Sequence, residues 1–140
     1  MAHFAEVIDG VVKRVIVAEQ PFIDKNMDNP EQWIQTSYNT RHGVYYTPNT
    51  ITPDPDQSKA LRKNFAEPNG TYDEELDAFL PPKPFPSWVL EDWEWKAPTP
   101  YPWEENKRFK WNEDEVRWEE IWLRKIENYL NQWILWTLDL

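Results

Sequence analysis

Three short segments between Tyr72 and Trp118 share one design, which constrains the fold of this chain more than any other feature. Each segment begins and ends with an aromatic residue, with six residues between them and acidic residues in the middle. The segments are residues 72–79, 88–95 and 111–118. Two short arms joined by an acidic turn predict a β-hairpin, in which facing aromatic residues contribute about 0.2–1 kcal/mol per pair.

A helix competes with the hairpin, because residues seven apart also share one face of a helix. Proline-rich stretches at residues 81–86 and 98–103 leave no room for long helices, which favours hairpins for the first two segments. No proline follows the third segment, so hairpin and helix are equally open there. We expect the proline stretches to be rigid extended spacers, although Pro81-Pro-Lys-Pro84 also fits the spacing of a PxxP ligand.

The N-terminal region predicts a small antiparallel sheet. Residues 4–8 and 11–17 favour strands and flank Asp9-Gly10, a strong hairpin signal because glycine supplies the positive φ of a tight turn. Residues 33–38 alternate as a third strand, which we expect to pair with this hairpin. Residues 21–27 predict one or two helical turns before it.

Residues 119–140 change character, since they contain neither proline nor glycine. Their apolar residues recur close to the 3.6-residue period of an amphipathic helix, which we expect to pack on another subunit. The expected contact residues of this helix are Ile121, Trp122, Ile126, Tyr129, Leu130 and Trp133.

The predicted fold is mainly β with a C-terminal helix. Residues 1–46 form an N-terminal hairpin and sheet domain in this prediction, and residues 47–70 form an irregular loop that contains proline. Residues 71–118 form an extended, proline-spaced arm of three aromatic hairpins, followed by the amphipathic α-helix of residues 119–140. An arm with little core of its own is suited to lying across a neighbouring protein.

Charge and composition exclude several classes of function. The formal net charge is −10, and residues 71–140 account for −8 of it with 8 basic and 16 acidic residues, so the chain is a poor candidate for binding nucleic acid. The absence of cysteine excludes disulfides and thiolate metal sites. Without a basic N-terminal region or a long apolar run, we expect synthesis in the cytoplasm with no signal peptide and no transmembrane segment.

Catalytic and metal-binding patterns do not stand out in the sequence. Nucleophilic catalysis needs a nucleophile, a base and an orienting group, and His3 and His42 belong to no such arrangement. Neither histidine has a partner at the spacing of a zinc site, and no glycine-rich phosphate loop occurs. We therefore expect a protein without enzymatic activity, cofactor or metal.

Aromatic residues are the strongest candidates for binding. With 10 Trp, 6 Tyr and 6 Phe, a chain of 140 residues leaves some of them at its surface or at an interface. Besides the helix, we expect protein contacts from Trp88, Trp95, Trp103 and Trp111. Exposed tryptophans also stack on sugar rings, so a carbohydrate-binding module is the alternative. Trp93, Trp103 and Trp136 break the hairpin or helix pattern and are the candidates for that role.

A combination of short segments within residues 2 to about 118 carries a resemblance to a known family. The segments are Ala2-His-Phe-Ala-Glu, Val15-Ile-Val17, Trp33-Ile-Gln-Thr-Ser-Tyr-Asn-Thr40, Leu61-Arg-Lys-Asn-Phe-Ala66, Gly70-Thr-Tyr-Asp73, Asp77-Ala-Phe79, Pro81-Pro-Lys-Pro84 and Ser87-Trp-Val-Leu90. In these segments the chain resembles small proteins encoded by tailed phages of marine bacteria, especially cyanophages. Family members tend to end near the third aromatic segment, so the helix after Glu119 departs from the family pattern.

The resemblance implies a structural or accessory protein of the virion, with no known catalytic or cofactor residues. We therefore expect a non-enzymatic virion protein that binds a neighbouring subunit, as a capsid decoration (cement) protein or as a tail or baseplate attachment protein. The expected partners are a major capsid or tail/baseplate subunit and further copies of the chain, with no nucleic acid and no membrane. The alternative is a carbohydrate-binding module that acts in host attachment.

Overall fold

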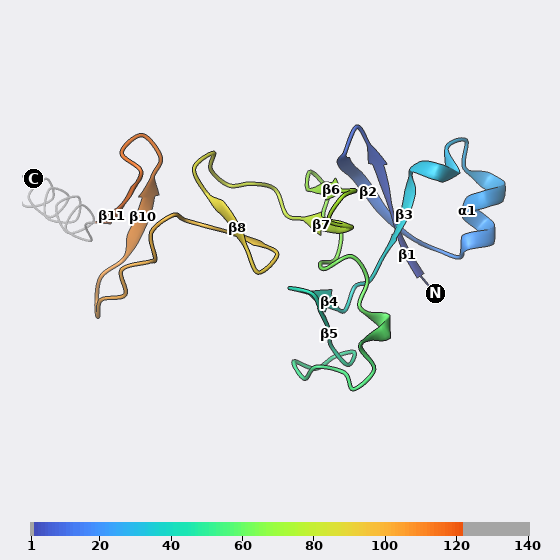
Figure 1. The fold of residues 1–140 in the computed structure, drawn as a ribbon, viewed down its shortest axis with the longest axis horizontal. Helices are drawn as coiled ribbons and strands as arrows, with labels where there is room; N and C mark the ends of the chain where they lie inside the picture. Colours follow the sequence, from blue (N-terminus) through green and yellow to red (C-terminus); the bar gives the residue numbers. More distant parts are fainter. Residues whose placement is uncertain (1, 122–140) are drawn as a thin grey trace, which may run out of the picture. The chain divides into compact units, whose positions relative to one another are not determined.

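The computed structural model describes residues 2–121, which form mainly β-strands (Figure 1). The chain divides into two compact units, Met1–Lys96 and Ala97–Leu140, called unit 1 and unit 2 below. The prediction of a mainly β fold with an antiparallel sheet is confirmed. In the described part of the chain, no helix is long and apolar enough to cross a membrane.

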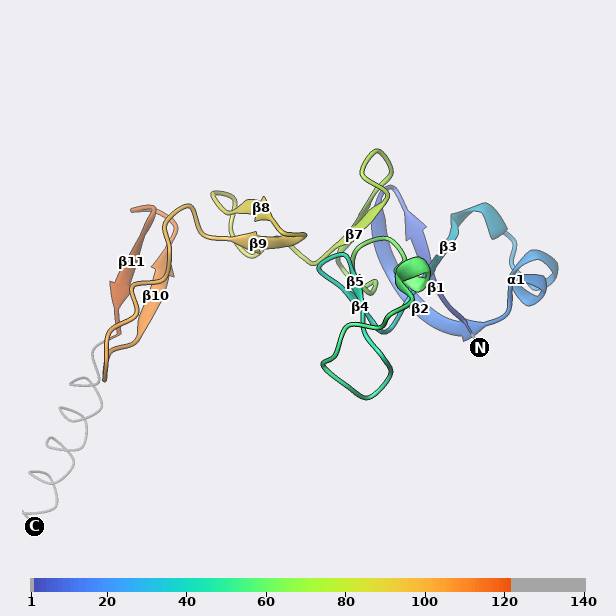
Figure 2. The same ribbon diagram turned by 60° about the horizontal axis from the view of Figure 1, so that its bottom comes forward.

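A five-stranded antiparallel sheet forms the centre of unit 1 (Figures 1 and 2). Its spatial order is β3-β1-β2-β6-β7. The strands are β1 (Ala2–Ile8), β2 (Val11–Ala18), β3 (Trp33–Thr36), β6 (Thr71–Asp73) and β7 (Ala78–Leu80). The expected pairing of the third N-terminal strand with the hairpin is confirmed, because Phe4 of β1 pairs with Gln35 of β3.

The turn at Asp9-Gly10 has the predicted geometry. Both residues have positive φ, 53° and 77°, as a two-residue turn of the primed type requires. A β-bulge between Glu6 and Val7 then shifts the register of β1 against β2. Bulges increase the local twist of a sheet, and here the shift leaves Val7 facing Val12.

Each face of the sheet carries a buried cluster. Neighbouring residues of a strand contribute to different clusters, because their side chains point to opposite faces. On one face Phe4 packs with Ile23 of the helix α1 (Gln20–Asn26) and with Trp33. On the other face the buried cluster comprises Ala5, Val7, Val12, Ala66 and Phe79. The helical turns expected before the third strand are confirmed, since α1 begins at Gln20 with proline in its first turn.

The remaining elements of unit 1 are short. A hairpin of β4 (Thr40–Arg41) and β5 (Val44–Tyr45) precedes a loop that ends in a 3₁₀ turn, η2 (Gln57–Lys59). A second 3₁₀ turn, η1 (Pro30–Gln32), leads into β3. The hairpin of β8 (Val89–Glu91) and β9 (Glu94–Lys96) completes the unit.

Unit 2 contains one described hairpin, formed by β10 (Phe109–Asn112) and β11 (Arg117–Glu120). The hairpin interpretation of the third aromatic segment is thereby confirmed over the helical one. Glu119 and Glu120 lie in β11, so the prediction that a helix begins at residue 119 is wrong, because these residues pair with Lys110 and Phe109. The rest of the expected helix, residues 122–140, lies outside the described residues.

The expectation that residues 71–118 form an extended, proline-spaced arm of three aromatic hairpins is also corrected. The first aromatic segment forms β6 and β7 and belongs to the central sheet, and the second belongs to unit 1. The physical reason is burial, since all three residues of β7, Ala78, Phe79 and Leu80, are buried. Backbone hydrogen bonds fix this edge, because the Tyr72 amide donates to the Gly10 carbonyl at 2.9 Å.

Candidate interaction surface

The first and third aromatic hairpins are built to the same plan. Tyr72 pairs with Phe79 and Trp111 pairs with Trp118, with ring centroids 5.0 Å and 5.3 Å apart. In both, a four-residue acidic turn begins after an Asp or Asn whose side chain accepts a backbone N–H three residues later at 3.0 Å. The repeat predicted from sequence therefore has a structural counterpart in these two hairpins, including the facing aromatic pair.

The second hairpin has a different register. Leu90, not Trp88, pairs with Trp95, because the turn contains two residues instead of four. Its turn residues, Asp92 and Trp93, both have positive φ, 54° and 63°. Trp88 lies before the strand and packs on Phe85, with ring centroids 5.5 Å apart. The predicted opposition of Trp88 and Trp95 is wrong for this reason.

The proline-rich stretches pack on the hairpins that follow them. Trp95 donates its indole N–H to the carbonyl of Pro81 at 2.8 Å, and Trp118 donates to the carbonyl of Thr99 at 2.9 Å. The Tyr101 hydroxyl accepts the backbone N–H of Phe109 at 3.0 Å. A two-stranded hairpin alone is marginal in water, so each proline stretch supplies the surface that its hairpin needs. These stretches therefore pack against the hairpins and are more than the extended spacers expected from sequence.

Asn64 joins parts of unit 1 that are distant in sequence. Its side-chain amide donates to the carbonyls of Phe79 and Trp93, at 2.9 Å and 2.7 Å, and its oxygen accepts the backbone N–H of His42 at 2.9 Å. One side chain therefore holds the turn after β4, the strand β7 and the tip of the β8–β9 hairpin. Sequence reasoning missed this role, because the irregular residues 61–66 show no periodicity.

The neighbours of Asn64 continue this network. The backbone N–H of Ala66 donates to the hydroxyl of Thr36 at 2.9 Å, which ties the segment to β3. Arg62 donates to the Gln35 carbonyl at 2.9 Å and lies 3.2 Å from the carboxylate of Asp77. The loop expected at residues 47–70 thus contains the segment that organises unit 1.

The predicted interface tryptophans have different environments. Trp111 is buried inside its own hairpin and donates its indole N–H to Glu113, and Trp88 and Trp95 are half-buried. Trp103 is 87% exposed, which sets it apart from the other tryptophans of residues 2–121. Ile121 is 42% exposed at the end of the described chain. The other predicted contact residues, Trp122, Ile126, Tyr129, Leu130 and Trp133, lie outside the described residues, as does Trp136.

Trp93 is occupied within unit 1. Its indole lies next to Gly43, where the Cβ carbon of any larger residue would lie 3.4 Å from the ring nitrogen. The ammonium group of Lys63 lies 5.1 Å from the ring centroid, at the distance of a cation–π contact. Through these contacts, Trp93 packs the tip of the β8–β9 hairpin against the rest of unit 1.

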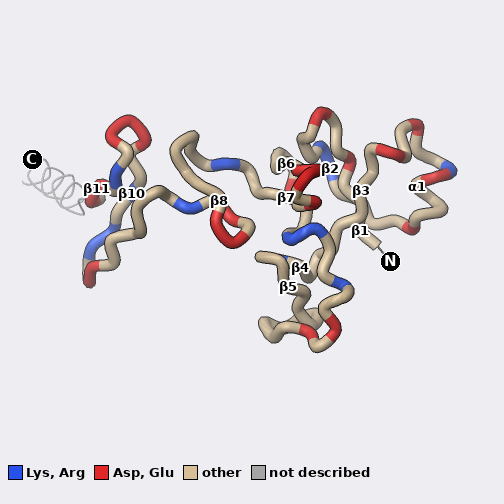
Figure 3. Tube along the Cα trace, in the orientation of Figure 1, with Lys and Arg blue, Asp and Glu red and all other residues tan. Residues whose placement is uncertain are grey.

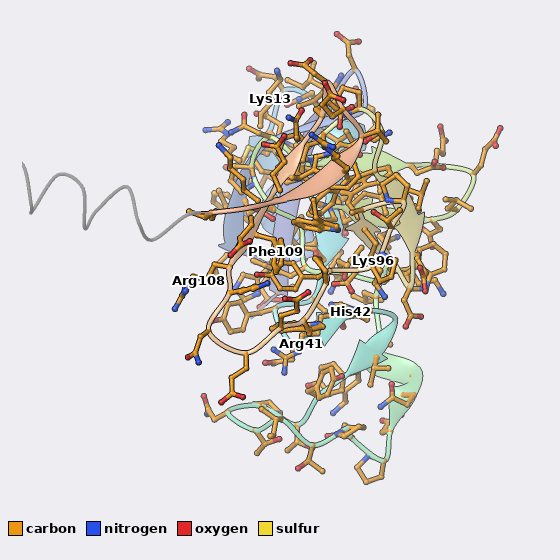
Figure 4. The ribbon with its side chains drawn as sticks, turned by 90° about the vertical axis from the view of Figure 1, so that its left-hand side faces the viewer. Lys13, Arg41, His42, Lys96, Arg108 and Phe109 are labelled. Atoms are coloured by element: carbon orange, nitrogen blue, oxygen red, sulfur yellow. The ribbon has the colours of Figure 1, made fainter. Side chains whose placement is uncertain are left out.

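An open cavity of about 700 Å³ adjoins Trp103 in unit 2. The indole contacts the ring of Tyr101, with centroids 4.6 Å apart, and charged residues surround it. Glu104 and Lys107 form an ion pair of 2.7 Å, and this hydrogen bond raises the pKa of the Lys107 ammonium group. Arg108 is exposed and points away from the hairpin (Figure 4), whereas the ring of Phe109 packs on Tyr101, with ring centroids 5.7 Å apart. An exposed aromatic residue inside a charged rim is the usual composition of a protein-binding surface.

Acidic residues gather at the tips of the three aromatic hairpins (Figure 3). Each tip contributes three carboxylates, from Glu74, Glu75 and Asp77, from Glu91, Asp92 and Glu94, and from Glu113, Asp114 and Glu115. Within residues 2–121, no group of three or more potential ligand side chains is close enough to hold a metal ion.

Comparisons with protein families, with curated proteins and with solved structures found no match.

Proposed function

We propose that the protein is a non-enzymatic structural protein of a tailed-phage virion. It binds a neighbouring virion subunit, as a capsid decoration (cement) protein or as a tail or baseplate attachment protein. The sequence resemblance supports the virion part of this proposal, and the surface around Trp103 supports the binding part. A major capsid or tail/baseplate subunit is the partner, and further copies of the chain are a second candidate neighbour.

The exposure of Trp103 is the observation that carries the proposal. An exposed indole gains little within its own chain, whereas burying a large apolar side chain stabilises a complex by roughly 1.5–3 kcal/mol. Tryptophan and arginine dominate the energetic centres of interfaces, and Arg108 lines the same cavity. The Tyr101 ring supports the indole from within unit 2, so the contact surface is formed before binding.

The charge of the second half of the chain favours a partner with a basic surface. Residues 71–140 carry −8, and the tip of the β10–β11 hairpin in unit 2 holds three of these carboxylates. Complementary charge speeds association and selects between partners more than it adds affinity. The partner surface therefore offers an apolar pocket for the indole and, elsewhere, basic residues that face the acidic tip of the β10–β11 hairpin.

Mass spectrometry of purified virions, separated into heads and tails, tests the proposal. A structural role predicts the protein in one of the two fractions at a fixed ratio to the major protein of that fraction. Absence of the protein from both fractions would contradict it.

The second candidate is a carbohydrate-binding module in host attachment, which the same exposed indole favours. Glycan-array binding that is lost in Trp103→Ala, without any binding to virions, would support this candidate over the structural one.

A further inference from the structure

An open cavity of about 670 Å³ lies in unit 1 beside the β4–β5 hairpin. Its lining comes from residues 38–52 and combines aromatic rings, amides, hydroxyls and one guanidinium group. The residues that matter below are Tyr38, Asn39, Arg41, Tyr46, Asn49 and Ile51. None of them has a role in the surface around Trp103, which belongs to unit 2.

Arg41 is the charged group of this cavity. Its guanidinium carbon lies 4.5 Å from the centroid of the Tyr46 ring, so a cation–π contact holds it in place. Among the residues that the structure describes, Arg41 forms no ion pair and no side-chain hydrogen bond. Figure 4 shows it next to His42, which by contrast lies 3.5 Å from Glu94. An oriented guanidinium group binds a planar carboxylate with two parallel hydrogen bonds.

Tyr38 is an exposed ring that is held in place. The side chain is 68% exposed, yet its ring stacks on His3 at 5.9 Å and meets the edge of Phe65 at 5.3 Å. These contacts hold the ring without covering it. A fixed, exposed aromatic ring is a suitable platform for the apolar face of another ring.

The loop that lines one side of the cavity is stabilised by hydrogen bonds within the loop. The backbone N–H of Thr47 donates to the Thr52 carbonyl at 3.1 Å, and the Thr50 hydroxyl donates to the Thr47 carbonyl at 2.7 Å. The Thr47 hydroxyl donates to the Asp54 carboxylate at 3.0 Å. Ile51, at the tip, is 85% exposed. A loop that is ordered before binding lowers the entropic cost of holding a ligand.

We propose that this cavity binds a saccharide that carries a carboxylate. The sugar ring lies on Tyr38, its carboxylate pairs with Arg41, and the amides of Asn39 and Asn49 are available to its hydroxyl groups. The net charge of −10 repels anions from the chain as a whole, so the affinity for an acidic saccharide depends on Arg41. This site is independent of the proposed docking of unit 2 on a virion.

The test uses two acidic saccharides, 3′-sialyllactose and trigalacturonate, in NMR titrations of the full chain. Lactose and methyl-esterified trigalacturonate are their neutral counterparts. We expect at least one acidic saccharide to bind tenfold or more tightly than its counterpart and to shift amide signals of residues 38–52. Arg41→Ala and Tyr38→Ala each weaken this binding at least tenfold, whereas Arg41→Lys, which keeps the charge without the planar fork, weakens it less.

Lys13→Ala is the matched control, because it removes the same charge from an exposed position on β2, outside the cavity lining (Figure 4). It should bind like the wild type. Failure of both acidic saccharides to bind at about 10 mM, a very weak affinity, would overturn the proposal. Wild-type affinity in Arg41→Ala would overturn it too. Equal binding of citrate would show a general anion site and would also overturn it.

Discussion

The side-chain amide of Asn64 donates a hydrogen bond of 2.7 Å to the backbone carbonyl of Trp93, 29 residues further along the chain. This bond fixes the tip of the β8–β9 hairpin to the irregular segment 61–66, which also contacts β3 and β7. Trp93 has φ of 63°, a conformation that is uncommon for a bulky residue and persists where its surroundings hold it. This hydrogen bond, together with the contacts of Trp93 with Gly43 and Lys63, holds the tip of the second aromatic segment against the rest of unit 1.

Asn64→Ala should lower the free energy of unfolding of unit 1 by about 2–4 kcal/mol, since it removes two partly buried hydrogen bonds and one exposed hydrogen bond. Urea unfolding followed by tryptophan fluorescence measures this change. Asn26→Ala is the control, because Asn26 makes one exposed hydrogen bond, to the Phe22 carbonyl, and should cost less than about 1 kcal/mol. Equal stability of the two variants would show that Asn64 does not organise unit 1.

Gly10→Val should destabilise the N-terminal hairpin by about 1 kcal/mol or more, because a β-branched residue disfavours the positive φ of 77° at this position. Space is not the cause, since the nearest atom to an added Cβ carbon, the Tyr72 carbonyl oxygen, is 4.0 Å away. Gly10→Asn is the matched variant, because asparagine tolerates positive φ, and it should unfold close to the wild type. The assignment of the turn fails if the valine variant melts at the wild-type temperature.

Tyr72 should make the stability of unit 1 sensitive to alkaline pH. The pKa of Tyr72 is raised above its ordinary value of 10.0. The larger cause is burial, and the second is the hydrogen bond that the Tyr72 hydroxyl donates to Asp77. A pKa that is higher in the folded state contributes stability that is complete below the unfolded pKa and is lost as pH rises through the folded pKa.

The measurement compares urea unfolding of the wild type and Tyr72→Phe at neutral pH and between about pH 9 and 11, around the ordinary tyrosine pKa. Tyr72→Phe should be less stable at neutral pH, since it loses the bond to Asp77, but its stability should fall less as the pH rises. Parallel stability curves would mean that the Tyr72 hydroxyl does not link folding to pH.

Local signals explain which parts of the fold could be predicted from sequence. The Asp9-Gly10 turn and the strands around it follow from short-range pattern alone, and both are confirmed. The acidic turns and facing aromatics of residues 72–79 and 111–118 also follow from their spacing. These features need no knowledge of the rest of the chain.

Long-range contacts explain what could not be predicted. The first aromatic hairpin joins the sheet through one residue pair, Val11 with Thr71, and through backbone bonds, which no local pattern shows. The two-residue turn at Asp92-Trp93 lacks the glycine that marks such turns, so its register could not be read from spacing. The exposure of Trp103 could not be predicted either, because it depends on which aromatic residues are buried in the hairpin of unit 2.

The role of Trp103 is the central claim, and two exposed apolar residues allow a matched comparison. Trp103 is 87% exposed in unit 2, and Ile51 is 85% exposed in unit 1. Alanine at either position should change the free energy of unfolding by no more than about 0.5 kcal/mol, because neither side chain is buried. Loss of binding in one variant therefore reports on contact with the partner and not on folding.

The proposed virion role of Trp103 is tested most directly by co-sedimentation of the purified protein with tailed-phage virions prepared without the native copy. The account predicts that the wild type and Ile51→Ala bind alike, while Trp103→Ala binds about 30-fold more weakly, as the loss of about 2 kcal/mol at an interface centre implies. Equal co-sedimentation of Trp103→Ala and the wild type would contradict it.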